Sequence, residues 1–225
     1  MNEILIEYLK EFITADRWEL FNKVIRNRTT YITVVLEDIF QPHNASAVLR
    51  TCDCFGLQDV HIIENENEYT VNPQVALGSD KWLHLKYHNT PEEHSTLSAI
   101  RNLKKQGYRI VATTPHTNDV NLEDFDLTKG KIALMFGTEQ HGLSETALEN
   151  ADEFLKIPMH GFTESFNISV SAAIILHYLT LKLTKSVENW TLTDAEQKEI
   201  LVEWLKISIK DGEKIADNFL TSNRL

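Results

Sequence analysis

The stretch IPMHGFTESFNISVSAAIILHYL, residues 157–179, begins as a polar loop and continues as an apolar helix. A helix needs a single N-capping side chain, yet Ser165, Asn167 and Ser169 could each take that role. The surplus hydroxyl and amide groups, with Gly161 among them, favour a loop that is shaped around a polar small molecule. Helix capping alone is the alternative, and it explains only part of the pattern.

A second polar group, QPHNASAVLRTCDCFG, spans residues 41–56. Asn44 is a suitable N-cap, and a helix that starts there would place Arg50 nearly two turns in. Arg50 would then share a face with Ala47 and Cys54. Taken alone, this pattern favours a capped core helix whose arginine pairs with a surface acid.

A third group, FGTEQHGLSE, spans residues 136–145 and directly follows an apolar run. Gly137 and Gly142 bracket Glu139, and glycine permits left-handed turns and close approach of the backbone to a ligand. Glu139 could therefore orient a helix terminus or a ligand amine. An ordinary strand-to-helix loop capped by Ser144 is the alternative, and this stretch alone does not decide between the two.

Several familiar site signatures are absent from the sequence. It has no G-x-G-x-x-G dinucleotide loop, no phosphate-binding loop with its lysine, no G-x-S-x-G nucleophile turn and no histidine pair at zinc spacing. Neither an ordinary Rossmann-type cofactor site nor a metal site is therefore predicted.

Strand and helix signals alternate along the middle of the chain. Apolar runs rich in β-branched residues predict strands at 31–37, 59–63, 108–114, 131–137 and 153–159. Helical segments lie between them, and one of these is opened by capping residues at 90–93 and ends at Gly107. This order predicts an α/β fold whose mostly parallel sheet is covered by helices on both faces.

In open α/β sheets, ligands bind beyond the carboxyl ends of the strands. Four loops leave the predicted strand ends here, near Asp38, Thr113, Gly137 and Met159. Three of these loops are rich in Gly, Asn, Ser or Glu. The region beyond the carboxyl ends of the strands is therefore the candidate ligand site.

Both ends of the chain are predicted to be helical. Residues 2–28 suit one or two amphipathic helices, and Asp16 and Glu19, at capping-box spacing, predict that the second starts at Arg17. Another capping-box pattern at Thr193 opens a helical tail. We therefore divide the chain into a helical N-terminal arm, an α/β core and a helical C-terminal arm, at residues 1–30, 31–186 and 187–225.

Charge and hydropathy narrow the classes of function. The 225 residues include 33 acids against 22 Lys and Arg, and the net charge of −11 argues against sequence-independent binding to polyanions. A local basic cluster of Lys23, Arg26 and Arg28 still allows a specific RNA contact. Because the sequence shows no bilayer-spanning run and no signal-peptide pattern, we expect a cytoplasmic protein with reduced Cys52 and Cys54.

Together, the three polar groups resemble the three motifs of the SpoU/TrmH family of RNA ribose 2'-O-methyltransferases, within the SPOUT superfamily. Each motif alone is weak to moderate, but three in order over about 130 residues make a strong match. The matching residues are Asn44, Ser46, Ala47, Arg50, Thr51, Asp53 and Gly56; Phe136, Gly137, Glu139 and Gly142; and Ile157, Pro158, Met159, Gly161, Ser165, Phe166, Asn167, Ile168, Ser169 and Val170.

Two further stretches, LEDIFQPHNASAVLRTCD and GSDKW, are similar to the branch of the family that methylates guanosine 18 in the tRNA D loop. The resemblance implies an α/β fold with a C-terminal deep trefoil knot, a homodimer, and S-adenosylmethionine as methyl donor to a tRNA ribose. Methylation of another site, in ribosomal RNA or the tRNA anticodon loop, is the nearest alternative. A non-catalytic RNA-binding module is a remote one.

The resemblance also assigns residues, position by position. The cofactor contacts, made largely by backbone, fall on Thr113, Gly137, Ile157 and Phe166. The catalytic set is Arg50, Asn44, Glu139, Ser165 and Asn167, in which Asn44 would orient Arg50 or the ribose. RNA is expected to dock on Lys23, Arg26, Arg28 and Lys81.

The resemblance credits Arg50 with activating the ribose hydroxyl, although a guanidinium is a poor base. In one version, burial beside other positive charge deprotonates it in part. In the other, it stays charged, grips the adjacent RNA phosphate and stabilises the developing alkoxide while the phosphate takes the proton. We favour the second version because it is less costly.

Overall fold

The computed structural model describes residues 2–89, 95–115 and 120–223. Within them the chain forms two compact units. The larger is an α/β domain of residues 30–190, and the smaller is a helical unit that combines residues 2–29 with residues 191–223. The helix opening predicted at residues 90–93 lies outside the described residues.

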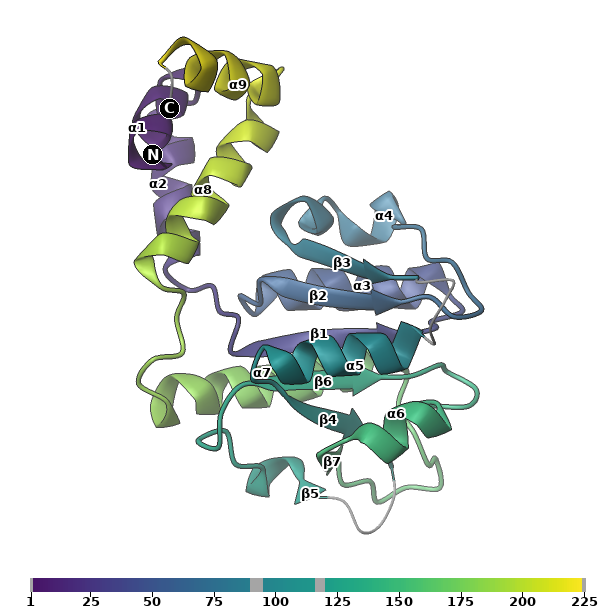
Figure 1. The fold of residues 1–225 in the computed structure, drawn as a ribbon. Coiled ribbons are helices and arrows are strands. Elements are labelled where there is room, and N and C mark those ends of the chain that lie inside the picture. The colour runs from purple at the N-terminus through teal and green to yellow at the C-terminus, as the bar shows by residue number, and fades with distance from the viewer. Residues whose placement is uncertain (1, 90–94, 116–119, 224–225) are drawn as a thin grey trace. The chain divides into compact units, whose positions relative to one another are not determined.

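The described part of the α/β domain is built on a parallel sheet in the order β3-β2-β1-β6-β4-β7-β5 (Figure 1). Its strands are β1 Ile32–Glu37, β2 Asp59–Ile63, β3 His84–His88, β4 Arg109–Thr113, β5 Val120–Asn121, β6 Ile132–Phe136 and β7 Glu153–Lys156. Every pairing among them is parallel, which confirms the predicted α/β class and sheet type.

Helices cover both faces of the sheet, with α3 and α7 on one face and α5 and α6 on the other (Figure 1). In β1, Val34 and Leu36 enter the core with α3 and α7, while Val35 enters the core with α5 and α6. Burying such a side chain contributes about 1.5–3 kcal/mol, so a strand covered on both sides carries a nearly unbroken apolar run. The helical segments are α3 Pro42–Cys54, α4 Pro73–Ala76, η2 Ser79–Trp82, α5 Ser95–Lys105, η3 Leu122–Asp124, α6 Glu145–Asn150 and α7 Ile168–Ser186.

The structure corrects one predicted helix start in this domain. Helix α3 begins at Pro42 with Gln41 at the N-cap, so Asn44 lies inside the first turn and is not its cap. A proline suits the first helical position, because its fixed φ matches the helix. The backbone N–H that proline lacks would have no acceptor within the helix at this position. The predicted cap of α6 is confirmed at Ser144, and Asn167 is the residue that caps α7.

Two strands were not predicted from the sequence. Strand β3, HLKYH, pairs with β2 at one edge of the sheet, and its side chains are only partly buried or exposed. Strand β5 has two residues and lies at the other edge. Neither has the apolar, β-branched run by which a buried central strand is detected.

The helical unit joins the two ends of the chain. Thr14 caps α2 through a bond from the Arg17 amide, so the second helix starts at Ala15, earlier than predicted. The predicted capping box at Thr193 is confirmed as the start of α8. In addition, the Tyr8 and Phe219 rings stack with their centroids 4.1 Å apart. The elements are α1 Asn2–Leu9, η1 Lys10–Phe12, α2 Ala15–Ile25, α8 Asp194–Ser208 and α9 Gly212–Ser222.

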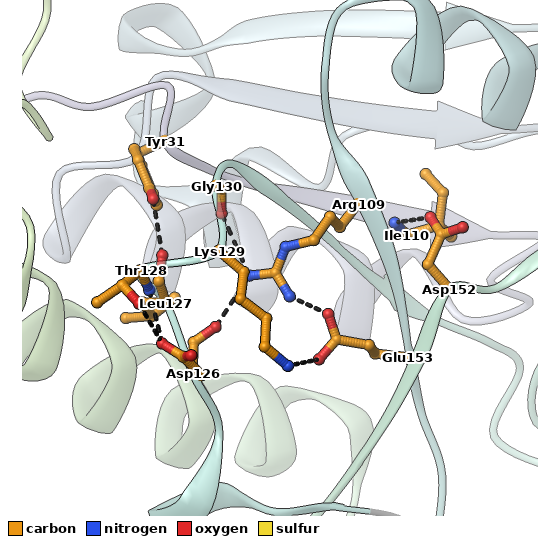
Figure 2. A network of polar contacts seen from close by, with 10 residues as sticks. All are labelled: Tyr31, Arg109, Ile110, Asp126, Leu127, Thr128, Lys129, Gly130, Asp152 and Glu153. Carbon is orange, nitrogen blue, oxygen red and sulfur yellow. Dashed lines mark hydrogen bonds and ion pairs between the residues drawn. The ribbon is translucent and has the colours of Figure 1, made fainter.

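A polar network at the amino ends of β4 and β7 ties these two strands to the loop before β6 (Figure 2). The Arg109 guanidinium forms an ion pair with Glu153 and donates to the backbone oxygen of Asp126 at 2.9 Å. In the same loop, the Tyr31 hydroxyl donates to the oxygen of Leu127 at 2.7 Å. This network lies at the amino ends of the strands, and the candidate ligand site lies beyond their carboxyl ends. We therefore assign the network a structural role.

Replacing Glu153 by glutamine is expected to lower the free energy of unfolding by about 1–2 kcal/mol, because a largely buried guanidinium loses its charged partner. Lys104→Gln is the matched control, since its ion pair with Asp152 is about 40% exposed on both sides, and it should cost less than about 0.5 kcal/mol. Urea denaturation of both variants measures the difference. Equal losses would contradict the role given to Glu153.

Candidate functional site

A cavity of about 340 Å³ lies beyond the carboxyl ends of β4, β6 and β7. Its walls come from the loops that follow these strands and from the first turns of α7. All four residues predicted to contact a cofactor are part of this lining: Thr113, Gly137, Ile157 and Phe166.

The loop of residues 137–143, here called the glycine loop, forms one wall of the cavity. Thr138 and Gly142 face each other across it, with their backbone N–H and C=O groups bonded at 2.9 and 3.0 Å. Gly142 has φ +70°, which favours glycine, and a Cβ on Gly137 would overlap the backbone of Gly142 and Leu143. Both glycines are therefore required for the tight form of this loop.

Three side chains, one from each polar group of the sequence, are joined by hydrogen bonds beside the cavity. The Asn44 amide donates to a carboxylate oxygen of Glu139 at 2.6 Å, and the Asn167 amide donates to Asn44 Oδ1 at 3.2 Å. Asn167 Oδ1 also accepts from the amide of Ser169 at 2.9 Å as the cap of α7. Asn44 thus links the start of α3 to the glycine loop and to α7.

The remaining catalytic candidates lie apart from this chain of bonds. Ser165 lines the cavity, whereas Arg50 is exposed on α3 and does not line it. Arg50 lies six positions after Asn44, which turns their side chains well away from each other around the helix. The polar atoms of Asn44 bond to Glu139 and Asn167 and make no bond to Arg50, and that Asn44 orients Arg50 or the ribose stays a prediction.

Ser46, another motif residue, has a different role. Its hydroxyl is buried, bonds to the Tyr69 hydroxyl at 2.8 Å and accepts from the Asn72 amide at 2.9 Å. Burial raises the pKa of Tyr69 to about 12, so its hydroxyl stays protonated at neutral pH. Ser46 therefore anchors the segment before α4 on α3.

The basic residues predicted to dock RNA divide into two kinds. Lys23, Arg26 and Lys81 are exposed. Arg28 is 1% exposed, and its guanidinium carbon lies 5.3 Å from the centre of the Trp204 ring. The prediction that Arg28 contacts RNA is therefore wrong for this structure, because its side chain packs against Trp204 of α8 in the interior of the helical unit.

Several residues that line the cavity were not predicted from the sequence. Ser171 and Ile175 come from α7, and Leu143 and Leu148 from the segment around α6. The spacing of 168, 171 and 175 on one helical face was the available signal, but a core helix has the same spacing.

Two further properties bear on the class of site. Among the described residues, no three or more His, Cys, Asp or Glu side chains are placed to hold a metal ion. None of the described helices has both the length and the apolar character that crossing a membrane requires.

Comparison with known proteins agrees with the geometry. Residues 31–177 match the SpoU rRNA Methylase family. A tRNA (guanosine(18)-2'-O)-methyltransferase of Borreliella burgdorferi is 43% identical over 218 residues, 96% of each chain. Its namesake from Thermus thermophilus is 35% identical over 86% of this chain and 97% of its own.

Among solved structures, the crystal structure of the A. aeolicus TrmH/SpoU tRNA modifying enzyme superposes with a TM-score of 0.76 and 27% identity, over 87% of this chain and 98% of the other. The α/β domain, the cavity and the three linked motifs lie inside or next to the matched region. On these grounds, the chain belongs to the SpoU rRNA methylase family.

Proposed function

We propose that this chain transfers a methyl group from S-adenosylmethionine to the ribose 2'-oxygen of guanosine 18 in the tRNA D loop. The observation that carries the proposal is that hydrogen bonds of Asn44 and Asn167 join the three motif stretches beside one cavity, which the second and third stretches line. The choice of guanosine 18 rests on the relatives with that name, which match this chain along most of its length.

The cavity suits the proposed methyl donor. Its volume of about 340 Å³ falls in the usual range for small-molecule sites, roughly 300–1,000 Å³. Ile157, Met159 and Phe166 offer apolar surface for an adenine ring, while Thr113 and Ser165 offer hydroxyl groups for polar parts of the ligand. Backbone from Gly137, Ile157 and Phe166 would make the closest contacts.

When bound, S-adenosylmethionine supplies a methyl group that its sulfonium already activates. The chain has to align the ribose 2'-oxygen for in-line displacement and help to remove its proton. We assign Arg50 to the second task in its charged form, because this side chain is exposed and among the described residues makes no hydrogen bond or ion pair. It is thereby available to an RNA phosphate, which takes the proton while the guanidinium stabilises the developing alkoxide.

Asn44, Glu139 and Asn167 would hold the ribose side of the pocket in place, and Ser165 would complete it. Lys23, Arg26 and Lys81 would contact tRNA phosphates. A chain with net charge −11 is then expected to make only a few phosphate contacts, so its tRNA affinity should fall modestly with salt.

Four further properties belong to the same proposal. The chain would act in the cytoplasm as a homodimer, and the C-terminal part of the α/β domain would be threaded as a deep trefoil knot. Exposed apolar residues on α7, Val170 at 44% and Leu181 at 50%, support a protein contact there. The terminal segments would serve as arms for tRNA.

The test uses methyl-labelled S-adenosylmethionine, unmodified tRNA transcripts and nuclease digestion to locate the label. Label on the ribose of guanosine 18, lost when that guanosine is replaced, is the expected result. Label elsewhere on tRNA would keep the chemistry and overturn the position. Failure to label tRNA or ribosomal RNA would overturn the proposed activity.

A further inference from the structure

Glu37, the last residue of β1, is a buried carboxylate that none of the three motifs includes. Its side chain is 2% exposed and accepts three hydrogen bonds. One oxygen accepts from the hydroxyls of Thr96 and Ser144, both at 2.6 Å, and the other accepts from the Ser144 backbone amide at 2.8 Å. Two of the three bonds thus hold a single residue, Ser144.

Ser144 directly follows the glycine loop and is the N-cap of α6. The other end of that loop is Phe136, which pairs with Leu36 in the parallel ladder of β1 and β6. Leu36 and Glu37 are neighbours, so β1 holds both ends of the loop, one end through backbone and the other through the Glu37 side chain.

The hydroxyl groups around Glu37 act as donors to it and as acceptors on their other side. The Thr96 hydroxyl already accepts from the Asn65 amide at 2.9 Å, and the Ser144 hydroxyl accepts from the Ala147 amide at 3.1 Å as the cap of α6. Because the Glu37 carboxylate can only accept, each hydroxyl directs its one hydrogen to it. The two oxygens of Glu37 thus accept from three donors. A carboxylate suits this position because both of its oxygens are acceptors, whereas an amide has only one acceptor oxygen.

The position of the glycine loop matters because it lines the cavity and presents Glu139 to Asn44. We propose that Glu37 is a positioning residue for the methyl-donor site: it fixes the Ser144 end of the glycine loop and so keeps the cavity in its binding shape. This inference rests on the proposed function, because it takes the cavity to bind S-adenosylmethionine. A binding site keeps its productive geometry only where supporting hydrogen bonds and packing hold its residues in place.

Glu37→Gln tests the inference with little change of shape. Its NH₂ either faces the Ser144 amide and loses that bond, or faces the hydroxyls of Thr96 and Ser144, which must then turn their own hydrogens away from residue 37. We expect the Kd for S-adenosylmethionine, measured by calorimetry on the full chain, to rise about tenfold. Amide hydrogen exchange in residues 138–144 should become faster, because the bonds between Thr138 and Gly142 lose their support.

Thr96→Val is the matched control. It removes one bond to the same carboxylate from the side of α5, together with the bond that Asn65 donates to Thr96, and leaves both bonds to Ser144 in place. This variant should lower the melting temperature while the Kd stays within twofold and exchange in the glycine loop stays at the wild-type rate. A merely structural role for Glu37 would instead make both variants behave alike.

The outcomes separate the inference from the proposed function. A Glu37→Gln chain with wild-type Kd, or parallel Kd changes in both variants, would overturn the positioning role. If the wild type fails to bind S-adenosylmethionine, the proposed ligand is wrong, and loop exchange alone then decides. Faster exchange only in Glu37→Gln supports the role, and equal exchange in both variants rejects it.

Discussion

Arg50→Ala is expected to slow methyl transfer to tRNA by about 10²–10³-fold, the usual cost of removing a group that stabilises charge developing in a transition state. The Kd for S-adenosylmethionine should stay within twofold, because Arg50 does not line the cavity. Single-turnover rates with saturating tRNA measure the first quantity, and calorimetry without RNA measures the second.

The comparison needs a control for simple loss of positive charge. Lys105→Ala removes an exposed cation from α5, on the opposite face of the sheet, and should leave both quantities near wild type. Arg50→Lys should remain strongly impaired, since an ammonium cannot grip a phosphate with two parallel bonds. Lost cofactor affinity equal to the lost rate would refute the assigned role.

The sequence predicted the central strands and the layers of the α/β domain because those elements carry local signals. Strand β1 is buried on both faces and shows this as an apolar run. Strand β3 is partly exposed at an edge, and its histidines and lysine gave no such signal. The start of α3 was misplaced because Asn44 is a good cap by type, while Pro42 defines the first helical position.

The site was predictable in its parts and not in its connections. The three motifs identified Asn44, Glu139 and Asn167, but the bonds between them span 95 and 123 residues of sequence. Arg28 shows the same limit, because only packing against Trp204 on α8 reveals that it is buried. Glu37 was missed for a related reason: the donors that give it a role lie on α5 and before α6.

Gly137→Ala is expected to damage the cavity more than any other single methyl group added to the glycine loop. The new Cβ would overlap the carbonyl of Gly142 and the amide of Leu143. Both obstacles are backbone, so the loop has to open and strain the bonds between Thr138 and Gly142. Overpacking of this kind costs about 1–3 kcal/mol, and the Kd for S-adenosylmethionine should rise about 10- to 100-fold.

Gly212→Ala provides a matched control, because its added Cβ would overlap the carbonyl oxygen of Lys206 in the helical unit, and none of the described residues of that unit is part of the cavity lining. Both variants should lose stability in urea, but only Gly137→Ala should lose cofactor affinity. If Gly137→Ala binds S-adenosylmethionine as the wild type does, the glycine loop is not a wall of the donor site. If both variants lose affinity alike, the loss reflects stability and not the shape of the cavity. The pair therefore decides whether the close approach of Gly137 to Gly142 serves binding or only folding.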